Sequence, residues 1–110
     1  MSGERILELV VFQLAEGVKE EELLQAVGPV SEWVKTQPGF ISRDLVRETE
    51  GNKWVEIVWW ESLEQAKAAA EAAMTSEACA PMFSKIDFEN IQMLHGTRAV
   101  AEVRPVRAAA

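Results

Sequence analysis

Residues 53–60 constrain the fold more than any other segment, because their sequence, Lys-Trp-Val-Glu-Ile-Val-Trp-Trp, contains three of the four tryptophans. Aromatic and β-branched residues favour a β-strand. The strand leads directly into a helix, since Ser62 with Gln65 three positions later forms a capping box, in which each side chain satisfies a free backbone amide. Three indole rings must be buried in a core, a partner or a ligand pocket.

The segments on either side predict a β-α-β-β-α-β order. We expect strands and helices, in chain order, over residues 5–14 (strand), 19–36 (helix), 40–48 and 53–60 (strands), 62–74 (helix, with a short helical piece towards 85) and 87–98 (strand). Pro29 should kink or split the first helix near Gly28, because proline removes a backbone hydrogen bond. Two right-handed crossovers place both helices on one face of a four-stranded antiparallel sheet, which is the α+β ferredoxin-like arrangement. We expect one domain over residues 1–98 and a tail or dimer arm over 99–110.

The other face of this sheet has no helix to cover it. Side chains that share strand parity make that face strongly apolar: Leu9, Val11, Val55, Ile57 and Trp59. A monomer that exposed so large an apolar area would be sticky. We therefore predict a homodimer with two-fold symmetry, joined face to face through its sheets into an α/β barrel.

Charge and composition exclude several classes of partner. The 110 residues carry a net charge of −7 without a Lys/Arg cluster, so neither nucleic acid nor an anionic membrane is expected. No apolar run approaches the roughly 20 residues of a membrane span, and residues 1–15 lack the pattern of a signal peptide. Cys79 has no second cysteine to pair with, which favours a small buried side chain in a cytoplasmic protein.

Motifs for bound groups are missing from the sequence as well. One histidine and one cysteine, far apart, do not make a metal site. No phosphate-binding loop or dinucleotide-binding glycine pattern is present, and no serine or threonine has a base beside it in the sequence. We expect neither a metal nor a cofactor.

Strand alternation gathers polar and aromatic side chains on the face opposite the predicted dimer face. The two central strands place there Glu8, Val10, Phe12, Trp54, Glu56, Val58 and Trp60. The outer strands offer two further sets: Ile41, Arg43, Leu45 and Arg47 on one, and Ile91, Met93 and His95 on the other. If the sets share one face, they form a mostly apolar pocket with a few polar groups, which is the usual form of a small-molecule site. A one-residue slip in register would turn any set over.

His95, Glu56 and Arg43 are the candidate catalytic residues. As the single imidazole, His95 is the natural general base near neutral pH; the alternative is a strand-end histidine that hydrogen-bonds Glu8 or the backbone. A carboxylate on a central strand needs a partner. For Glu56 and Glu8 the partner would be Arg43, His95 or Arg5, or else the carboxylates orient His95 or a ligand hydroxyl. Arg43 would hold an anionic substrate group or form a surface or dimer-rim salt bridge.

Glu8, Phe12, Trp54, Trp60 and Met93 are the candidate substrate-binding residues. Trp54 and Trp60 would stack on a planar ligand. As structural alternatives, Trp60 is a packing anchor and Trp54, at the hairpin end, is partly exposed. Met93 would belong either to the core or to a flexible pocket wall.

Four segments give the chain a resemblance to a known superfamily. They are the strand Glu8-Leu-Val-Val-Phe-Gln-Leu, the helix exit Gln37-Pro-Gly-Phe40, the junction Trp60-Glu-Ser62 and the closing Phe83…Ile86-Asp87…Met93-Leu-His95. Over residues 5–98 the chain resembles the dimeric α/β-barrel superfamily, which includes the antibiotic-biosynthesis-monooxygenase-like and stress-responsive barrel domains.

The resemblance implies a ligand cavity between the sheet and its helices. Some members of the superfamily oxygenate aromatic molecules without a cofactor, and the implied function is a cofactor-independent monooxygenase-like or isomerase-like enzyme that acts on a hydrophobic aromatic molecule. The alternatives are a non-catalytic small-ligand-binding or stress-related dimer, and a dimer whose cavity is plugged by Trp60, Phe83 and Met93. Haem degradation is disfavoured, because no histidine lies between Ser62 and Lys85 to ligate iron.

Overall fold

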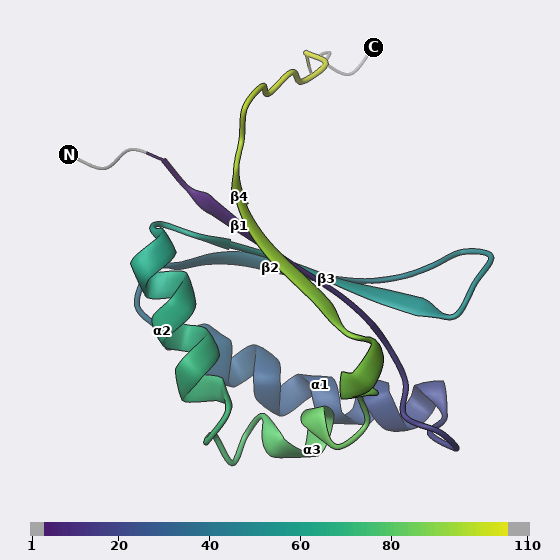
Figure 1. The fold of residues 1–110 in the computed structure, drawn as a ribbon. Helices are drawn as coiled ribbons and strands as arrows, with labels where there is room; N and C mark the ends of the chain where they lie inside the picture. The colour runs from purple at the N-terminus through teal and green to yellow at the C-terminus, as the bar shows by residue number, and fades with distance from the viewer. Residues whose placement is uncertain (1–3, 106–110) are drawn as a thin grey trace, which may run out of the picture.

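The computed structural model describes residues 4–105 as one antiparallel sheet with its helices on one side (Figure 1). The strands are β1 (Ile6–Gln13), β2 (Phe40–Arg47), β3 (Lys53–Trp60) and β4 (Gln92–Thr97). The helices are α1 (Glu20–Val34), α2 (Leu63–Ala73) and the short α3 (Ala80–Phe83), and the 3-10 turn η1 (Phe88–Asn90) precedes β4. The sheet order, β2-β3-β1-β4, confirms the predicted ferredoxin-like fold.

Local signals explain where β2 and α2 begin. The hydroxyl oxygen of Ser62 accepts a hydrogen bond from the Gln65 amide at 3.1 Å, which caps α2 as predicted. The reciprocal half of the box differs, because Gln65 Oε1 lies 3.1 Å from the Ser62 hydroxyl instead of accepting from the Ser62 backbone amide. Before β2, Gly39 has a φ of 84°, in the region that favours glycine, and a Cβ there would collide with the Gln65 side chain.

The first helix and the last strand differ from the sequence-based expectation. Pro29 lies inside α1, which runs without a break from Glu20 to Val34, so the helix does not split. The last strand is shorter than residues 87–98. The Asp87 carboxylate accepts hydrogen bonds from the Glu89 backbone amide (3.0 Å) and the Asn90 side chain (2.7 Å), which closes η1 and delays β4.

The strand register brings the predicted polar sets to the helix-facing side of the sheet. Glu8 on β1 pairs with Val58 on β3 and with His95 on β4. Arg43 on β2 pairs with Val58 from the other side, so the three residues on β2, β1 and β4 lie in one row across the sheet. Ile41 is an exception, because a register shift at the start of β2 removes it from the alternation.

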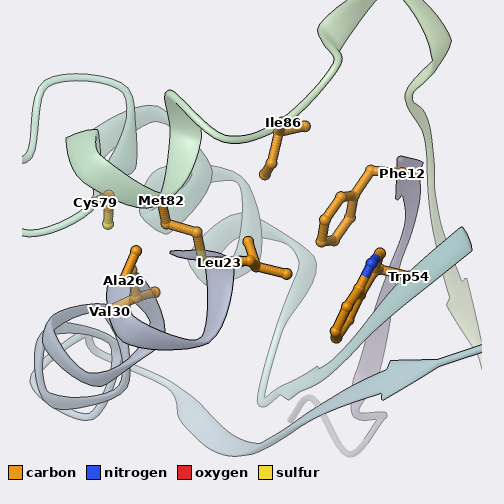
Figure 2. Packing of buried hydrophobic residues seen from close by; sticks show 8 residues of the cluster. All are labelled: Phe12, Leu23, Ala26, Val30, Trp54, Cys79, Met82 and Ile86. Carbon is orange, nitrogen blue, oxygen red and sulfur yellow. The ribbon is translucent and has the colours of Figure 1, made fainter. Parts of the chain in front are cut away.

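Two clusters of buried side chains fill the space between the sheet and the helices. The larger cluster joins residues of the central strands, of α1, and of α3 and the chain on either side of it, namely Phe12, Leu23, Ala26, Val30, Trp54, Cys79, Met82 and Ile86 (Figure 2). The second joins Ile6, Val34, Val58, Trp60, Ala66 and Ala69. Trp54 is only 5 % exposed, so the expected partial exposure at the hairpin end is wrong; its cross-strand neighbour is Phe12. The buried alanines of α2 let that helix approach the sheet closely.

The opposite face of the sheet is not covered by any described helix (Figure 1). Apolar cross-strand pairs run along its two central strands, namely Leu7 with Trp59, Leu9 with Ile57 and Val11 with Val55. We call these six residues the outer stripe. Beyond β4, residues 98–105 contain no helix or strand and lead away from the helices, and the Arg98 guanidinium lies 4.5 Å above the Trp59 ring.

Two further observations concern membrane-spanning helices and the ends of the chain. None of the helices in residues 4–105 is both long and apolar enough to cross a membrane. Residues 1–3 and 106–110, including the end of the predicted arm, lie outside the described residues.

Candidate functional site

A cavity of about 190 Å³ lies between the helix-facing side of the sheet and the helices. Most of its lining is apolar: Val10, Phe12 and Val58 from the strands, alanines of α2, and Met82 and Phe83 of α3. Its charged lining consists of Glu8, Arg43 and Glu56. The cavity therefore combines an apolar wall with a small polar group on the sheet, which is typical of small-molecule sites.

Arg43 and Glu56 form a buried, bidentate ion pair on this wall. Arg43 Nε and Nη2 donate to the two Glu56 carboxylate oxygens at 2.8 and 2.7 Å, and the two side chains are only 8 % and 15 % exposed. The remaining contacts of the guanidinium reach the helices: Nη1 donates to the Ser31 hydroxyl of α1 at 3.1 Å, and Nη2 lies 3.7 Å from the sulfur of Met82. The positive charge of Arg43 is thus matched within the protein.

Glu8 lies on the same wall but is not part of this ion pair. Its Oε1 accepts a hydrogen bond from the indole N–H of Trp60 at 2.8 Å, whereas its Oε2 accepts none from the described residues. Burial raises the pKa of the Glu8 carboxyl, the Trp60 hydrogen bond partly opposes that rise, and the negative charge of Glu56 adds to it. Glu8 therefore holds a proton more readily than an ordinary glutamate.

His95 is in the row of Glu8 but does not line the cavity. Its Nε2 is buried without a hydrogen-bond partner among the described residues. Burial lowers the pKa of the His95 imidazole, and the nearby positive charge of Lys67 on α2 lowers it further. Of the two hydrogen bonds considered as the structural alternative for His95, the one to Glu8 is not formed.

The structure separates the remaining predicted site residues into two groups. Phe12, Trp60 and Met93 line the cavity together with Glu8. Trp54 does not; it is packed in the larger core cluster. Trp60 is 2 % exposed and is held by Glu8 and by an edge-to-face contact with Phe40, whose ring centroid lies 5.8 Å away, so it is both a packing anchor and a cavity wall.

Exposed apolar side chains mark the mouth of the cavity. Met74, Phe88 and Met93 all line it, yet they are 67 %, 47 % and 47 % exposed. Phe83, also on the lining, packs edge to face on Phe88 with ring centroids 5.9 Å apart. Trp60, Phe83 and Met93 all line a cavity that keeps a volume of about 190 Å³, so these side chains do not fill it.

Ser31 is a site residue that the sequence analysis missed, because it reaches Arg43 only through the packing of α1 on the sheet. Met82, expected from the sequence to be core or pocket wall, and Cys79 both line the cavity. Cys79 is 1 % exposed, as its alanine-rich surroundings suggested, and burial raises the pKa of its thiol. Within residues 4–105, no group of three or more His, Cys, Asp or Glu side chains is arranged to hold a metal ion.

Comparison with known proteins identifies the family. Residues 6–81 match the model of the antibiotic biosynthesis monooxygenase family, and the chain belongs to that family. Comparison with curated proteins finds no match.

Solved structures share the fold at low sequence identity. SnoaB, a cofactor-independent oxygenase from Streptomyces nogalater, is 16 % identical with a TM-score of 0.65 over 94 % of this chain and 100 % of its own. The ActVA-Orf6 monooxygenase of Streptomyces coelicolor, solved with nanaomycin D, is 21 % identical with a TM-score of 0.67 over 93 % of this chain and 94 % of its own. A dimeric ferredoxin-like protein of unknown function from Thermobifida fusca is 10 % identical with a TM-score of 0.69 over 89 % and 94 %.

Proposed function

We propose that this chain is a cofactor-independent, monooxygenase-like enzyme that acts on a small, hydrophobic aromatic molecule held in the cavity. One observation carries the proposal: a carboxylate with a raised pKa, Glu8, stands on an apolar cavity wall with one oxygen unengaged. A group of this kind is suited to accept a proton from a bound substrate. Membership of the monooxygenase family and the fold shared with two oxygenases support this reading.

The proposed reaction begins with proton transfer to Glu8. The Oε2 atom takes a proton from an activated carbon or from a hydroxyl group of the substrate. The substrate anion gives electrons to molecular oxygen, a carbon–oxygen bond forms, and the peroxide recovers the proton from Glu8. Loss of water then leaves a carbonyl group, so that one oxygen atom stays in the product and the other leaves as water. The substrate itself is the reductant, and a dry cavity protects the reactive anion.

The other predicted catalytic residues take different proposed roles in this scheme. Arg43 and Glu56 fix each other and tie α1 to the sheet, so we assign them the positioning of the cavity wall. Trp60 orients Glu8 through its indole N–H. His95, the base expected from the sequence, is the competing candidate and enters the test below.

The test is oxygen consumption by the purified protein with a panel of one-ring and two-ring phenols and hydroquinones, in the presence of a metal chelator. We expect consumption above the uncatalysed rate, a loss of about 10²-fold or more in Glu8→Gln, and a nearly unchanged rate in His95→Gln. A large loss of rate in His95→Gln with a nearly unchanged rate in Glu8→Gln would instead identify His95 as the base. Binding without oxygen consumption in the wild type would overturn the enzyme proposal in favour of the non-catalytic ligand-binding dimer.

We also propose that the protein is a homodimer, formed through the outer stripe. Leu9 and Ile57 lie at the centre of this continuous apolar surface, which no described helix covers. The Thermobifida fusca protein of the same fold, described as dimeric, supports the proposal. Light scattering should give twice the monomer mass for the wild type and the monomer mass for Ile57→Lys; a monomeric wild type would refute it.

A further inference from the structure

The charges on the cavity wall determine which ligands can enter. Three charged side chains line it, and two of them, Arg43 and Glu56, neutralise each other through two hydrogen bonds of 2.8 and 2.7 Å. The third, Glu8, carries a negative charge when it is ionised, and no cation pairs with it among the described residues. The wall therefore presents a net negative charge, or no charge when Glu8 is protonated, and the described residues that line it offer no free cation.

The guanidinium has little capacity left for a ligand. Both Glu56 oxygens, the Ser31 hydroxyl and the Met82 sulfur surround Arg43, whose side chain is 8 % exposed. To bind the guanidinium through two hydrogen bonds, a ligand carboxylate or phosphate would have to displace Glu56, which would then remain buried without a partner. Leaving a buried charge unpaired is strongly unfavourable.

Entry through the mouth adds a second barrier to charged molecules. The mouth is formed by Met74, Phe88 and Met93, which offer an ion no compensating charge. A neutral aromatic molecule meets no such barrier. An apolar cavity of about 150 Å³ takes up benzene, so the 190 Å³ present here suits one substituted ring.

We infer that the cavity selects neutral, one-ring aromatic molecules that donate a hydrogen bond to Glu8 Oε2, and that it rejects anionic molecules of the same size. This inference rests on the proposed function, for which it defines the substrate class. It is consistent with the proposed chemistry, because proton transfer from a neutral hydroxyl to Glu8 leaves the total charge in the cavity unchanged. An anion that entered already charged would add a negative charge that nothing on the wall balances.

Isothermal titration calorimetry with three ligands tests this inference. The ligands are p-cresol, which is neutral with a hydroxyl, toluene, which lacks the hydroxyl, and benzoate, which is an anion. We expect the wild type to bind p-cresol at least tenfold more tightly than benzoate, and more tightly than toluene. Equal affinities for p-cresol and benzoate, or no binding of any ligand, would overturn the inference.

Three variants separate the cavity charges from the overall negative charge of the protein. Glu8→Gln should shrink the preference for p-cresol over benzoate several-fold. Glu20→Gln removes one carboxylate outside the cavity and should leave that preference unchanged. Glu56→Gln, checked for folding by circular dichroism, frees the Arg43 guanidinium and should make benzoate the preferred ligand. An unchanged preference in both Glu8→Gln and folded Glu56→Gln would also overturn the inference.

The outcome is independent of whether the protein is an enzyme. These titrations measure binding without oxygen consumption. The predicted preference together with a failed turnover assay would refute the monooxygenase proposal and leave the ligand selectivity standing. Turnover of an anionic substrate would support the monooxygenase proposal and refute the ligand selectivity.

Discussion

Breaking the buried ion pair should cost far more stability than breaking an exposed one. In Glu56→Ala, Arg43 would keep its charge at 8 % exposure and lose both carboxylate hydrogen bonds. Removal of one partner from such a pair costs about 3–5 kcal/mol, a large part of the roughly 5–15 kcal/mol that stabilises a typical domain. With a urea dependence of about 2 kcal/mol per M, the unfolding midpoint should fall by about 2 M.

Urea unfolding followed by tryptophan fluorescence measures this midpoint directly. Two control variants show whether the loss comes from a buried, unpaired charge. Glu20→Ala breaks the ion pair with Arg47, whose side chains are 40 % and 58 % exposed, and should leave the midpoint nearly unchanged. The double variant Arg43→Met with Glu56→Leu removes both charges and should recover most of the loss. A Glu56→Ala midpoint as close to the wild type as that of Glu20→Ala would refute the reasoning that this pair is desolvated.

Further predictions concern Glu8, Gly39 and the cavity volume. The pKa of Glu8 is raised in the folded state, so its contribution to stability is complete below its ordinary pKa and is lost as the pH rises through the raised value. The melting temperature of Glu8→Gln relative to wild type should therefore climb as the pH rises above the ordinary glutamate pKa, and a flat difference would contradict the shift. Gly39→Ala should destabilise by about 1–3 kcal/mol in urea. A Gln65→Ala background removes the two nearest colliding atoms and keeps the Gln65 Cβ, so it should relieve part of this cost but not the backbone strain; full relief would show that the whole cost came from the Gln65 side chain. Ala73→Leu, on the cavity lining, should fill empty volume, raise stability by up to about 2 kcal/mol and abolish p-cresol binding, whereas unchanged binding would locate the ligand elsewhere.

The layout of the sheet follows from strand alternation, and this part of the structure could be predicted. Glu8, Glu56 and Arg43 were expected on one face because side chains alternate along a strand, and the register confirms it. The junction from β3 into α2 was also readable, since the Ser62 cap is a local interaction between residues three positions apart. Such features depend on neighbours in the sequence.

The details of the site depend on how helices pack, and sequence patterns do not report that. Arg43 meets Ser31 and Met82 across 12 and 39 positions, so nothing local marks these contacts. His95 shares the strand parity of Met93, which lines the cavity from the same strand, yet His95 itself lies outside the lining, near Lys67 of α2. Trp54 looked suited to a ligand, yet Phe12 and the rest of the larger cluster bury it. Strand parity identifies a face, and the helices decide which part of that face remains open.

The most direct test of the account is a crystal structure of the protein with p-cresol. The account predicts the ring inside the cavity behind Met93, with the ligand hydroxyl within hydrogen-bond distance of Glu8 Oε2 and the Arg43–Glu56 pair intact. A ring bound only on the outer stripe, or a hydroxyl paired with Arg43 in place of Glu56, would contradict it.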